Sequence, residues 1–262
     1  MNPADIIEQE AAECSEPAAH SSSPSNVASR TLALLSAFDE TRAVLGVTDL
    51  ARAAAVPKST AHRLLTVMLR HGYIKRDGNR YRLAEHVFEL GSRAAGPRGL
   101  RDRAIPFMVE LHHETRAVVH LAVLHDDQVL YLEKVFGHGG WPCPTAIGSR
   151  NPAHCTALGK VLLSRSPDGV VEDIVRRGLP RLTEKTVSVP GAFYRELSRA
   201  QDDGVAVEIE QCRLGLACVA APIIDRRSQQ PIAALSISTT TAHFNATRLA
   251  DRVRKAAAAL SS

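Results

Sequence analysis

With 262 residues, 45% of them apolar, and a mean hydropathy of −0.09, the chain has the composition of a globular protein long enough for two domains. Its net charge is only +4, and no apolar run is long enough to cross a bilayer, which excludes a membrane-spanning protein. The first residues lack the basic and then apolar pattern of a secretion signal, so we expect a cytoplasmic location.

Residues 1–25 carry five acids and neither Lys nor Arg, a composition that predicts a disordered tail. A first domain is predicted over residues 26–83. It begins with an amphipathic helix at 27–38, followed by TDLARAAA (48–55), for which Thr48 is a suitable N-cap. Val56-Pro57 then ends this helix, because proline disfavours a helical residue before it and is well placed at the start of the next helix.

The next helix, PKSTAHRLLTVMLR (57–70), presents two faces. One carries apolar residues at helical spacing, namely Ala61, Leu64, Leu65 and Met68, and the other carries Ser59, His62, Arg63 and Thr66. A helix in a DNA major groove needs both, since one side packs on its own domain while the other meets base edges and phosphates. The alternative interpretation is that the polar face is only a solvated surface.

A short basic hairpin is predicted directly after this helix. His71-Gly72 is a helix stop, and the segments 73–76 and 80–83 flank an Asp-Gly turn. Residues 58–82 hold seven Lys and Arg against one acid, Asp77, so their local charge of +6 exceeds the charge of the whole chain. Such clustering favours phosphate binding. The segment therefore predicts a winged helix-turn-helix that binds double-stranded operator DNA.

Two kinds of DNA contact are expected in this domain. We assign groove contacts to Ser59, Thr60, His62 and Arg63, and contacts with phosphates or the minor groove to Lys58, Arg76 and Arg80. The first residues of the helix also offer free backbone N–H groups, which favour phosphate.

Residues 84–99 are predicted to link two domains. The segment 84–95 continues as a helix with Val87, Leu90 and Ala94 on one face, a suitable surface for a second copy of the chain. The GPRG segment, Gly96–Gly99, is expected to mark the domain boundary. Since a helix-turn-helix usually needs two copies to reach two half-sites, we expect a homodimer.

The remaining residues, 100–262, predict an α+β domain. A helix over 100–115 precedes two apolar strands around the turn at 125–128, and further helices are expected near 154–164 and after Pro190. Strands follow at 204–208, 216–225 and 231–239, and an Ala-rich helix ends the chain. Antiparallel hairpins with helices around them indicate an α/β sandwich with an antiparallel sheet.

Polar side chains interrupt the apolar strands of this domain. Ser236 and Ser238 alternate with apolar residues, so that both hydroxyls point to one face, and Cys218 lies within LACVAAPIID. The helix start at 154–156 offers backbone N–H groups suited to an organic anion. The alternative is structural, because buried serines often bond a neighbouring carbonyl and a buried cysteine acts as a small hydrophobe.

Three separated motifs resemble the IclR family of transcriptional regulators. They are VTDLARAAAVPKSTAHRLLTVMLRHGYIKRDGNRYRL, GSRNPAHCTALGKVLL, and GLACVAAPIID followed by AALSIS. The resemblance implies a GAF-like effector-binding domain behind the winged helix and a homodimer or dimer of dimers. It also implies control, which we expect to be repression, of a catabolic or metabolic operon by a small effector.

The effector pocket of the family, carried over onto matching positions, implies that five residues contact the effector: Glu208, Leu216, Cys218, Ser236 and Ser238. Glu208 stands where the best-known relative has the shorter Asp. Because a carboxylate in the pocket disfavours a dianion, we expect a monoacid, a hydroxylated ligand or an aromatic acid rather than a dicarboxylate.

Two rival functions would use the cysteines. An enzyme would need Cys155 or Cys218 as a nucleophile, with a base supplied by His154 or His243. The sequence contains no nucleophile elbow, P-loop or dinucleotide fingerprint, so we expect neither an enzyme nor a cofactor. A regulator could instead respond to thiol oxidation or to a metal through Cys143, Cys155 or Cys218. The cysteine spacing matches none of the common structural zinc patterns, so no metal is expected.

Overall fold

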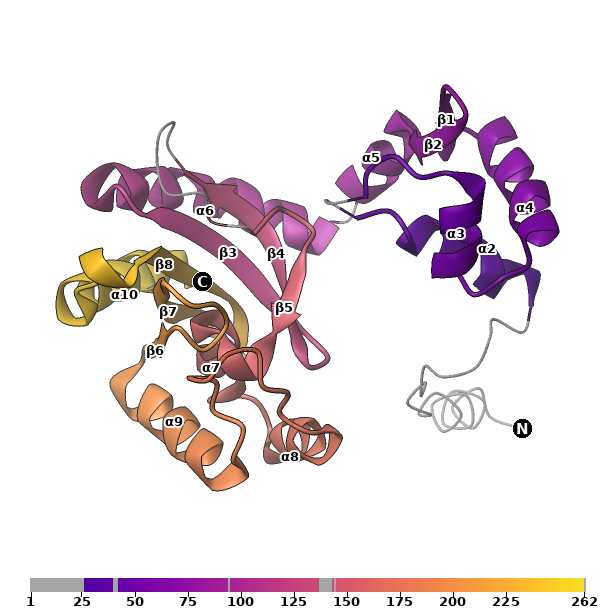
Figure 1. Cartoon of the computed structure of the whole chain (residues 1–262). Coiled ribbons are helices and arrows are strands. Elements are labelled where there is room, and N and C mark those ends of the chain that lie inside the picture. Colours follow the sequence, from indigo (N-terminus) through magenta and orange to yellow (C-terminus); the bar gives the residue numbers. More distant parts are fainter. Residues whose placement is uncertain (1–25, 40–41, 94, 137–142, 144, 262) are drawn as a thin grey trace, which may run out of the picture. The chain divides into compact units, whose positions relative to one another are not determined.

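The computed structural model describes residues 26–39, 42–93, 95–136, 143 and 145–261 (Figure 1). The tail predicted at 1–25 and the predicted interface residue Ala94 lie outside this part of the chain. The chain divides into two compact units between Glu89 and Leu90. None of the described helices is both long enough and apolar enough to span a bilayer.

The N-terminal unit is a winged helix-turn-helix. It consists of α2 (Val27–Ser36), α3 (Val47–Ala53), α4 (Lys58–Arg70), β1 (Ile74–Asp77) and β2 (Arg80–Leu83). The inner face predicted for α4 is confirmed, since Ala61, Leu64, Leu65 and Met68 are all buried. They pack with Leu34 of α2 and Leu50 of α3 in one apolar core. This packing leaves the polar face of α4 exposed to solvent.

The start of α3 differs from the prediction, which placed the N-cap at Thr48. The N-cap is Gly46, with φ −78° and ψ 161°, and the helix already begins at Val47. Leu45 forms a backbone bridge with Tyr81 of β2, with N–O distances of 3.0 and 2.8 Å. Because this bridge holds the chain extended up to Gly46, the extended residue that an N-cap requires falls there and not at Thr48.

The segment Gly96–Gly99, which is predicted to mark the domain boundary, lies within a helix. After α5 (Glu85–Ser92), a new helix α6 (Ala95–Thr115) begins before this segment and includes it. Pro97 is compatible with this position because the N–H groups of the first helical turn have no intrahelical partner to lose.

The C-terminal unit is built on a six-stranded antiparallel sheet with the order β5-β4-β3-β8-β7-β6. The strands are β3 (Val118–His125), β4 (Gln128–Val135), β5 (Arg150–Pro152), β6 (Ala206–Ile209), β7 (Leu216–Ile224) and β8 (Pro231–Thr240). Every neighbouring pair is antiparallel, which confirms the predicted sheet. The central strands β3 and β8 come from distant parts of the sequence, with Val118 opposite Ser238.

Helices cover both faces of this sheet (Figure 1). One face is covered by α6 and α10 (Ala246–Leu260), which follows the short 3-10 turn η2 (Thr241–His243). The other face is covered by the 3-10 turn η1 (Ala153–Cys155), α7 (Ala157–Leu163), α8 (Asp168–Arg177) and α9 (Pro190–Asp203). Because side chains alternate along a strand, β3 contributes Leu121 to one apolar core and Ala122 to the other.

The start of α7 lies directly against η1. A Cβ atom added at Gly159 would lie 2.1 Å from the carbonyl oxygen of Ala153, so only glycine fits at this position without a backbone shift. Thr156 caps α7, and its Oγ1 accepts a hydrogen bond of 3.1 Å from the N–H of Gly159. The helix start predicted as an anion site therefore has this N–H group occupied.

Candidate functional site

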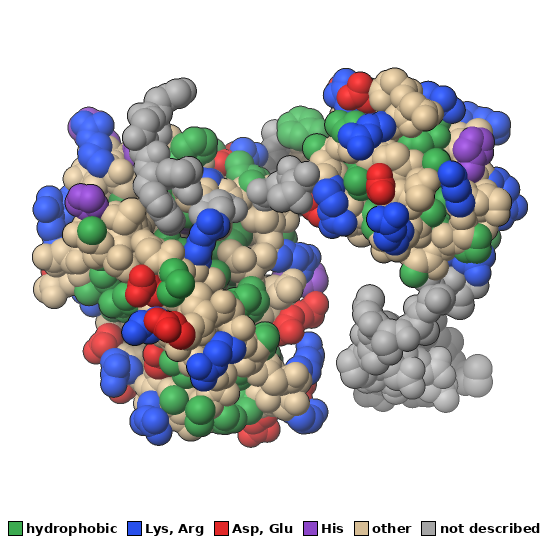
Figure 2. Space-filling view, viewed as in Figure 1, with side chains coloured by type: hydrophobic (Ala, Val, Ile, Leu, Met, Phe, Trp, Pro, Cys, Tyr) green, Lys and Arg blue, Asp and Glu red, His purple; other side chains and the backbone are tan. Residues whose placement is uncertain are grey.

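The residues predicted to contact DNA lie on the surface of the N-terminal unit. Lys58, Ser59, His62 and Arg63 are exposed on α4 and Thr60 is half-buried, while Arg76 and Arg80 are exposed on the hairpin. Among the described residues Lys58, Arg63 and Arg80 form no salt bridge, which leaves their charges available for phosphate. Figure 2 shows Lys and Arg side chains outnumbering acidic ones on the visible face of this unit.

The turn between α3 and α4 sets the angle at which α4 is presented. Ala55 has φ +51°, the left-handed conformation of a helix C-terminal cap. The N–H of Val56 donates to the carbonyl of Ala51 at 3.0 Å, which is the outer hydrogen bond of a Schellman motif. In the hairpin that forms the wing, the Arg76 guanidinium of β1 lies 5.7 Å from the centre of the Tyr81 ring of β2, and this contact orients the guanidinium.

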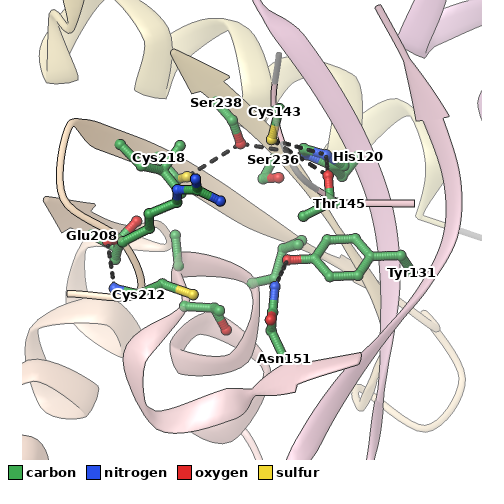
Figure 3. A pocket seen from close by; sticks show the side chains of 15 residues that line it. His120, Tyr131, Cys143, Thr145, Asn151, Glu208, Cys212, Cys218, Ser236 and Ser238 are labelled. Carbon is green, nitrogen blue, oxygen red and sulfur yellow. Dashed lines mark hydrogen bonds between the residues drawn. The ribbon is translucent and has the colours of Figure 1, made fainter. Parts of the chain in front are cut away.

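A cavity of about 350 Å³ lies in the C-terminal unit between the sheet and the start of α7 (Figure 3). Its walls come from β3 to β8, from the segment before β5 and from the β6–β7 turn. The lining residues are His120, Tyr131, Cys143, Thr145, Asn151, Thr156, Ala157, Leu158, Glu208, Cys212, Arg213, Leu216, Cys218, Ser236 and Ser238. All five residues predicted to contact an effector therefore lie in the walls of one cavity.

One wall of the cavity is a hydrogen-bonded chain that crosses three strands. The Cys218 thiol donates to Oγ of Ser238 at 3.2 Å, and that hydroxyl lies 3.3 Å from Nδ1 of His120. Nε2 of His120 lies 2.6 Å from Oγ1 of Thr145. Burial, assisted by the charge of Lys134, lowers the pKa of His120 to about 3, so the imidazole is neutral. A neutral ring has one donor and one acceptor nitrogen, which matches its two hydroxyl partners.

The segment before β5 is held over the cavity by Lys134 of β4. The Lys134 ammonium donates to the carbonyl oxygens of Cys143, at 2.7 Å, and of Thr145. Tyr131, also on β4, contributes its ring to the cavity, and its hydroxyl accepts a 3.2 Å hydrogen bond from the Asn151 amide. The wall formed by β4 and β5 is therefore polar at the Tyr131 hydroxyl and apolar along the Tyr131 ring.

Two buried oxygen atoms in the cavity walls have no hydrogen-bond partner in the described residues: Oγ of Ser236 and Oε2 of Glu208. The side chains of both residues are almost fully buried, at 1% exposure. Buried polar groups in native proteins are nearly always satisfied, by the protein, by water or by a ligand. Unsatisfied groups that share one cavity indicate a site shaped for a polar molecule.

The other oxygen of Glu208 is firmly held. Its Oε1 accepts hydrogen bonds from the backbone N–H groups of Gln211, at 2.7 Å, and Cys212, at 3.0 Å. Burial raises the pKa of Glu208, while these two N–H groups, the Cys218 thiol and the charge of Lys160 act in the opposite direction. The carboxyl group is thus oriented by the β6–β7 turn, and its Oε2 has no hydrogen-bond partner by geometry in the described residues, although the Cys218 thiol lies nearby.

Several lining residues were not found from the sequence. His120 and Tyr131 lie in strands read only as apolar, and their roles depend on which strands pair. Arg213 is exposed, and it is the single Lys or Arg among the described lining residues. Its position two residues before the GLAC segment could have suggested it. Cys212, for which the sequence predicts no role, also lines the cavity.

The cysteines and histidines of the rival enzyme hypothesis are not arranged as nucleophile and base. His154 is buried with Nε2 2.9 Å from the carbonyl oxygen of Pro180, and His243 lies 2.9 Å from Oγ1 of Thr240. Burial raises the pKa of Cys218, which disfavours its thiolate. No group of three or more His, Cys, Asp or Glu side chains in the described part of the chain is placed to hold a metal ion.

Comparison with known proteins identifies relatives of both units. Residues 27–78 match the IclR helix-turn-helix domain, and residues 93–262 match the C-terminal domain described as bacterial transcriptional regulator IclR. The chain is 34% identical over 235 residues to the HTH-type transcriptional regulator KdgR of Escherichia coli, which covers 88% of this chain and 89% of that protein. It is 31% identical over 214 residues to the transcriptional repressor IclR of the same organism, over 80% and 78% of the two chains.

A solved structure is similar over nearly the whole described chain. It is an IclR homologue from Microbacterium hydrocarbonoxydans in complex with 4-hydroxybenzoate. The TM-score is 0.84 at 28% sequence identity, and the match covers 90% of this chain and 98% of that one. The IclR of Thermotoga maritima is also similar, with a TM-score of 0.71 and 25% identity, over 90% and 97% of the two chains.

Proposed function

The chain belongs to the IclR family and is therefore a DNA-binding transcriptional regulator and not an enzyme, and we propose that it is a cytoplasmic repressor released by a small organic acid. The observation that carries the proposal is the cavity with two unsatisfied buried oxygens, on Ser236 and Glu208. Repression is supported by relatives that carry the name of repressor, among them the acetate operon repressor of Salmonella typhimurium.

The chemistry of the two free oxygens suggests the class of effector. An ionised Glu208 accepts a hydrogen bond, so it favours a ligand hydroxyl or ammonium group. The Ser236 hydroxyl can donate to a ligand carboxylate. Arg213 adds an attraction for an anion at the same cavity. A hydroxylated monoacid meets these requirements, whereas a dicarboxylate would set its second charge against Glu208. A cavity of about 350 Å³ accommodates one small aromatic or aliphatic acid.

The DNA contacts proposed for the N-terminal unit follow from its exposed face. We assign groove contacts to Ser59, Thr60, His62 and Arg63, which lie along the outer side and first turn of α4. Phosphate contacts are assigned to Lys58, Arg76 and Arg80, because they are exposed cations that form no salt bridge in the described residues. Arg76 is held near the wing by Tyr81 and Arg80 lies at the start of β2.

A second copy of the chain is the proposed protein partner. On α5, Phe88 is 77% exposed and Leu90 is 39% exposed, and both are large apolar side chains. Exposed apolar surface on a helix next to a DNA-binding unit is suited to a homodimer, which would place two copies of α4 on two half-sites. A dimer of dimers is compatible with the same surface.

The proposal is tested by fluorescence anisotropy of the purified protein on its own upstream intergenic DNA and on scrambled DNA. Each titration is made at two salt concentrations and repeated with a panel of hydroxylated monoacids, including 4-hydroxybenzoate, and of dicarboxylates. Selective binding that a monoacid weakens is the expected result. Equal binding to both DNAs would remove the operator from the proposal, and an unchanged isotherm with every acid would remove the effector class.

A thiol-responsive regulator is the second candidate, since Cys143, Cys212 and Cys218 line the same cavity. Burial raises the pKa of Cys218, and the pKa of Cys155 is raised by its interaction with Cys212 and by burial. The same interaction lowers the pKa of Cys212, which is half-buried. A peroxide response would therefore act through Cys212. Peroxide that changes DNA affinity in the native protein but not in Cys212→Ser would favour this candidate.

A further inference from the structure

Lys160 is the only lysine or arginine in the described residues whose side chain is buried, with 1% exposure. It lies on α7, where the neighbouring side chains are apolar, and it does not line the effector cavity. Its ammonium nitrogen is 2.6 Å from Oε2 of Glu196 on α9 and donates a 2.7 Å hydrogen bond to Oε1 of Gln211. The Gln211 amide in turn donates to the second Glu196 oxygen at 3.1 Å. Lys160, Glu196 and Gln211 thus form a closed triangle behind the cavity wall.

This triangle fixes the turn that holds Glu208. The backbone N–H of Gln211 and that of Cys212 are the two groups that bind Oε1 of Glu208. The carbonyl of Gln211 also accepts a 2.7 Å hydrogen bond from Oγ1 of Thr186, so the turn is anchored from two sides. Glu210, within the same turn, has φ +59°, a conformation that non-glycine residues adopt only when their surroundings impose it. The hydrogen bond from Lys160 to the Gln211 side chain adds to the contacts that hold this turn.

Burying a lysine is unfavourable unless its charge and its protons are all matched. Desolvation of a buried ion pair can exceed the attraction between its charges, so well-packed apolar residues often stabilise a fold equally well. Helix α7 is otherwise apolar, and a Met at position 160 would be compatible with its burial. A buried cation at this place therefore points to a requirement other than stability.

We propose that Lys160 is a positioning residue that holds the Glu208 carboxyl group turned toward the cavity and places a positive charge behind it, so that the cavity accepts hydrogen-bond donors and rejects a second carboxylate. The inference rests on the proposed function, since it concerns the effector cavity. Lys160 acts in two ways: it holds the turn that binds Oε1, and its positive charge favours the ionised form of Glu208.

The groups around Glu208 leave Lys160 as the charged group that can do this. Glu208 interacts with three thiols, which are Cys155 of η1, Cys212 of the β6–β7 turn and Cys218 of β7. Cys155 and Cys218 are thiols with a raised pKa, and a Cys212 thiolate would disfavour a charge on Glu208. Arg213, at the cavity wall, is exposed and therefore screened by solvent. Lys160 from α7 is buried, so its effect is not screened in the same way.

The first test measures the titration of Glu208 by carbon NMR of the full-length protein labelled at glutamate carboxyl carbons. Glu208→Gln identifies the resonance. In Lys160→Met the midpoint of Glu208 should rise by about half a pH unit or more, because a nearby opposite charge is removed. In Glu196→Gln it should fall, because the charge of Lys160 is no longer balanced. Lys185→Met removes an exposed lysine of the same unit and should leave the midpoint unchanged.

An unchanged midpoint in a folded Lys160→Met protein would overturn the inference. If that variant does not fold, Lys160→Gln takes its place, because glutamine removes the charge and keeps a polar side chain for Glu196 and Gln211. A raised midpoint of Glu208 in Lys160→Gln then supports the role of Lys160, and an unchanged midpoint overturns it.

The second test measures selectivity by calorimetric titration with 4-hydroxybenzoate and with terephthalate. The two probes share the ring and one carboxylate and differ in carrying a hydroxyl or a second carboxylate. The native protein should bind 4-hydroxybenzoate more tightly than terephthalate. In Lys160→Met the ratio of the two dissociation constants should change about tenfold or more toward terephthalate, an effect of about 1.4 kcal/mol. An unchanged preference would overturn the inference. If neither probe binds the native protein, the proposed effector class fails, and the Glu208 titration still decides the role of Lys160.

Discussion

Nδ1 of His120 lies 3.3 Å from Oγ of Ser238, although 118 residues separate the two in the chain. The contact exists because β3 and β8 are neighbours at the centre of the sheet, with His120 opposite Ser236 and Val118 opposite Ser238. The pairing places a neutral imidazole beside both serines of β8. Of these serines only Ser238 is engaged by the ring, and Oγ of Ser236 remains without a partner in the described residues.

This difference predicts opposite effects for the two serines. In Ser236→Ala no hydrogen bond of the protein is lost, so the free energy of unfolding should change by less than about 0.5 kcal/mol. Effector affinity should fall by about 0.5–1.5 kcal/mol, the typical net contribution of one hydrogen bond. Thermal unfolding with and without 4-hydroxybenzoate measures both quantities.

Ser238→Ala is the matched control, because it leaves the Cys218 thiol and the imidazole of His120 without their partner. It should lower the free energy of unfolding by about 1–3 kcal/mol even without ligand. Equal destabilisation by both substitutions would show that the Ser236 hydroxyl has a structural partner and is not kept for a ligand.

Glu208 should make stability depend on pH. Burial raises its pKa above the ordinary 4.5, so the folded protein binds this proton more tightly than the unfolded chain does. The free energy of unfolding contributed by Glu208 therefore falls as the pH rises from about 4.5 through the raised pKa. Glu208→Gln removes the titration and keeps an oxygen that accepts from Gln211 and Cys212. Relative to the native protein, the variant should gain stability between about pH 4.5 and neutral pH.

Urea unfolding of both proteins at several pH values in this range measures the difference directly. A difference in the free energy of unfolding that stays constant with pH would mean that burial does not disfavour the charged form. The native protein would then need no counter-charge behind the cavity, which would also weaken the role inferred for Lys160.

Much of the cavity could be predicted because strand alternation is visible in sequence. The period of two in Leu235–Ser238 places both serines on one face whatever the strand pairs with, and the structure places them on one wall. The N-cap at Gly46 could not be predicted in this way, because it depends on the bridge between Leu45 and Tyr81. Lys160 is a second case: a lysine in a helical segment reads as exposed, and only the packing of α7, α9 and the β6–β7 turn shows it buried.

Arg63 and Arg80 should affect DNA binding differently. Arg63→Ala should lower affinity for the operator by about 1–3 kcal/mol if it contacts a guanine, with less effect on scrambled DNA. Arg80→Ala should weaken binding to all sequences about equally. It should also reduce the slope of log affinity against log salt concentration by about 1. Anisotropy titrations on both DNAs over a salt series separate the two effects.

Arg177→Ala, at the exposed end of α8 in the other unit, is the control and should leave DNA binding unchanged. Equal losses on operator and scrambled DNA in Arg63→Ala would assign Arg63 to phosphate. A loss confined to the operator in Arg80→Ala would make Arg80 a base contact.

The turn before α4 offers a stabilising substitution. Ala55 has φ +51°, a left-handed conformation in which an L residue with a Cβ is strained by about 1 kcal/mol. Ala55→Gly should remove this strain and raise the free energy of unfolding of the N-terminal unit by somewhat less than that, because glycine is also more flexible in the unfolded chain. Thermal unfolding measures the change. A lower midpoint would show that the Ala55 methyl group makes packing contacts that outweigh the strain.

Gly159→Ala should have the reverse effect at the cavity. The added Cβ would meet the carbonyl oxygen of Ala153 at 2.1 Å and its Cα at 2.3 Å, and both are backbone atoms that cannot rotate away. Either η1 or α7 must move, at a cost of about 1–3 kcal/mol in the free energy of unfolding. Thr156, Ala157 and Leu158, which lie between Ala153 and Gly159 in the chain, line the cavity, so effector affinity should fall as well.

Gly169→Ala on α8 is the control, because its Cβ would meet no atom within 4 Å. It should leave the free energy of unfolding unchanged or slightly higher. If Gly159→Ala retained native stability and native affinity, the close contact between η1 and α7 could not be what shapes this end of the cavity.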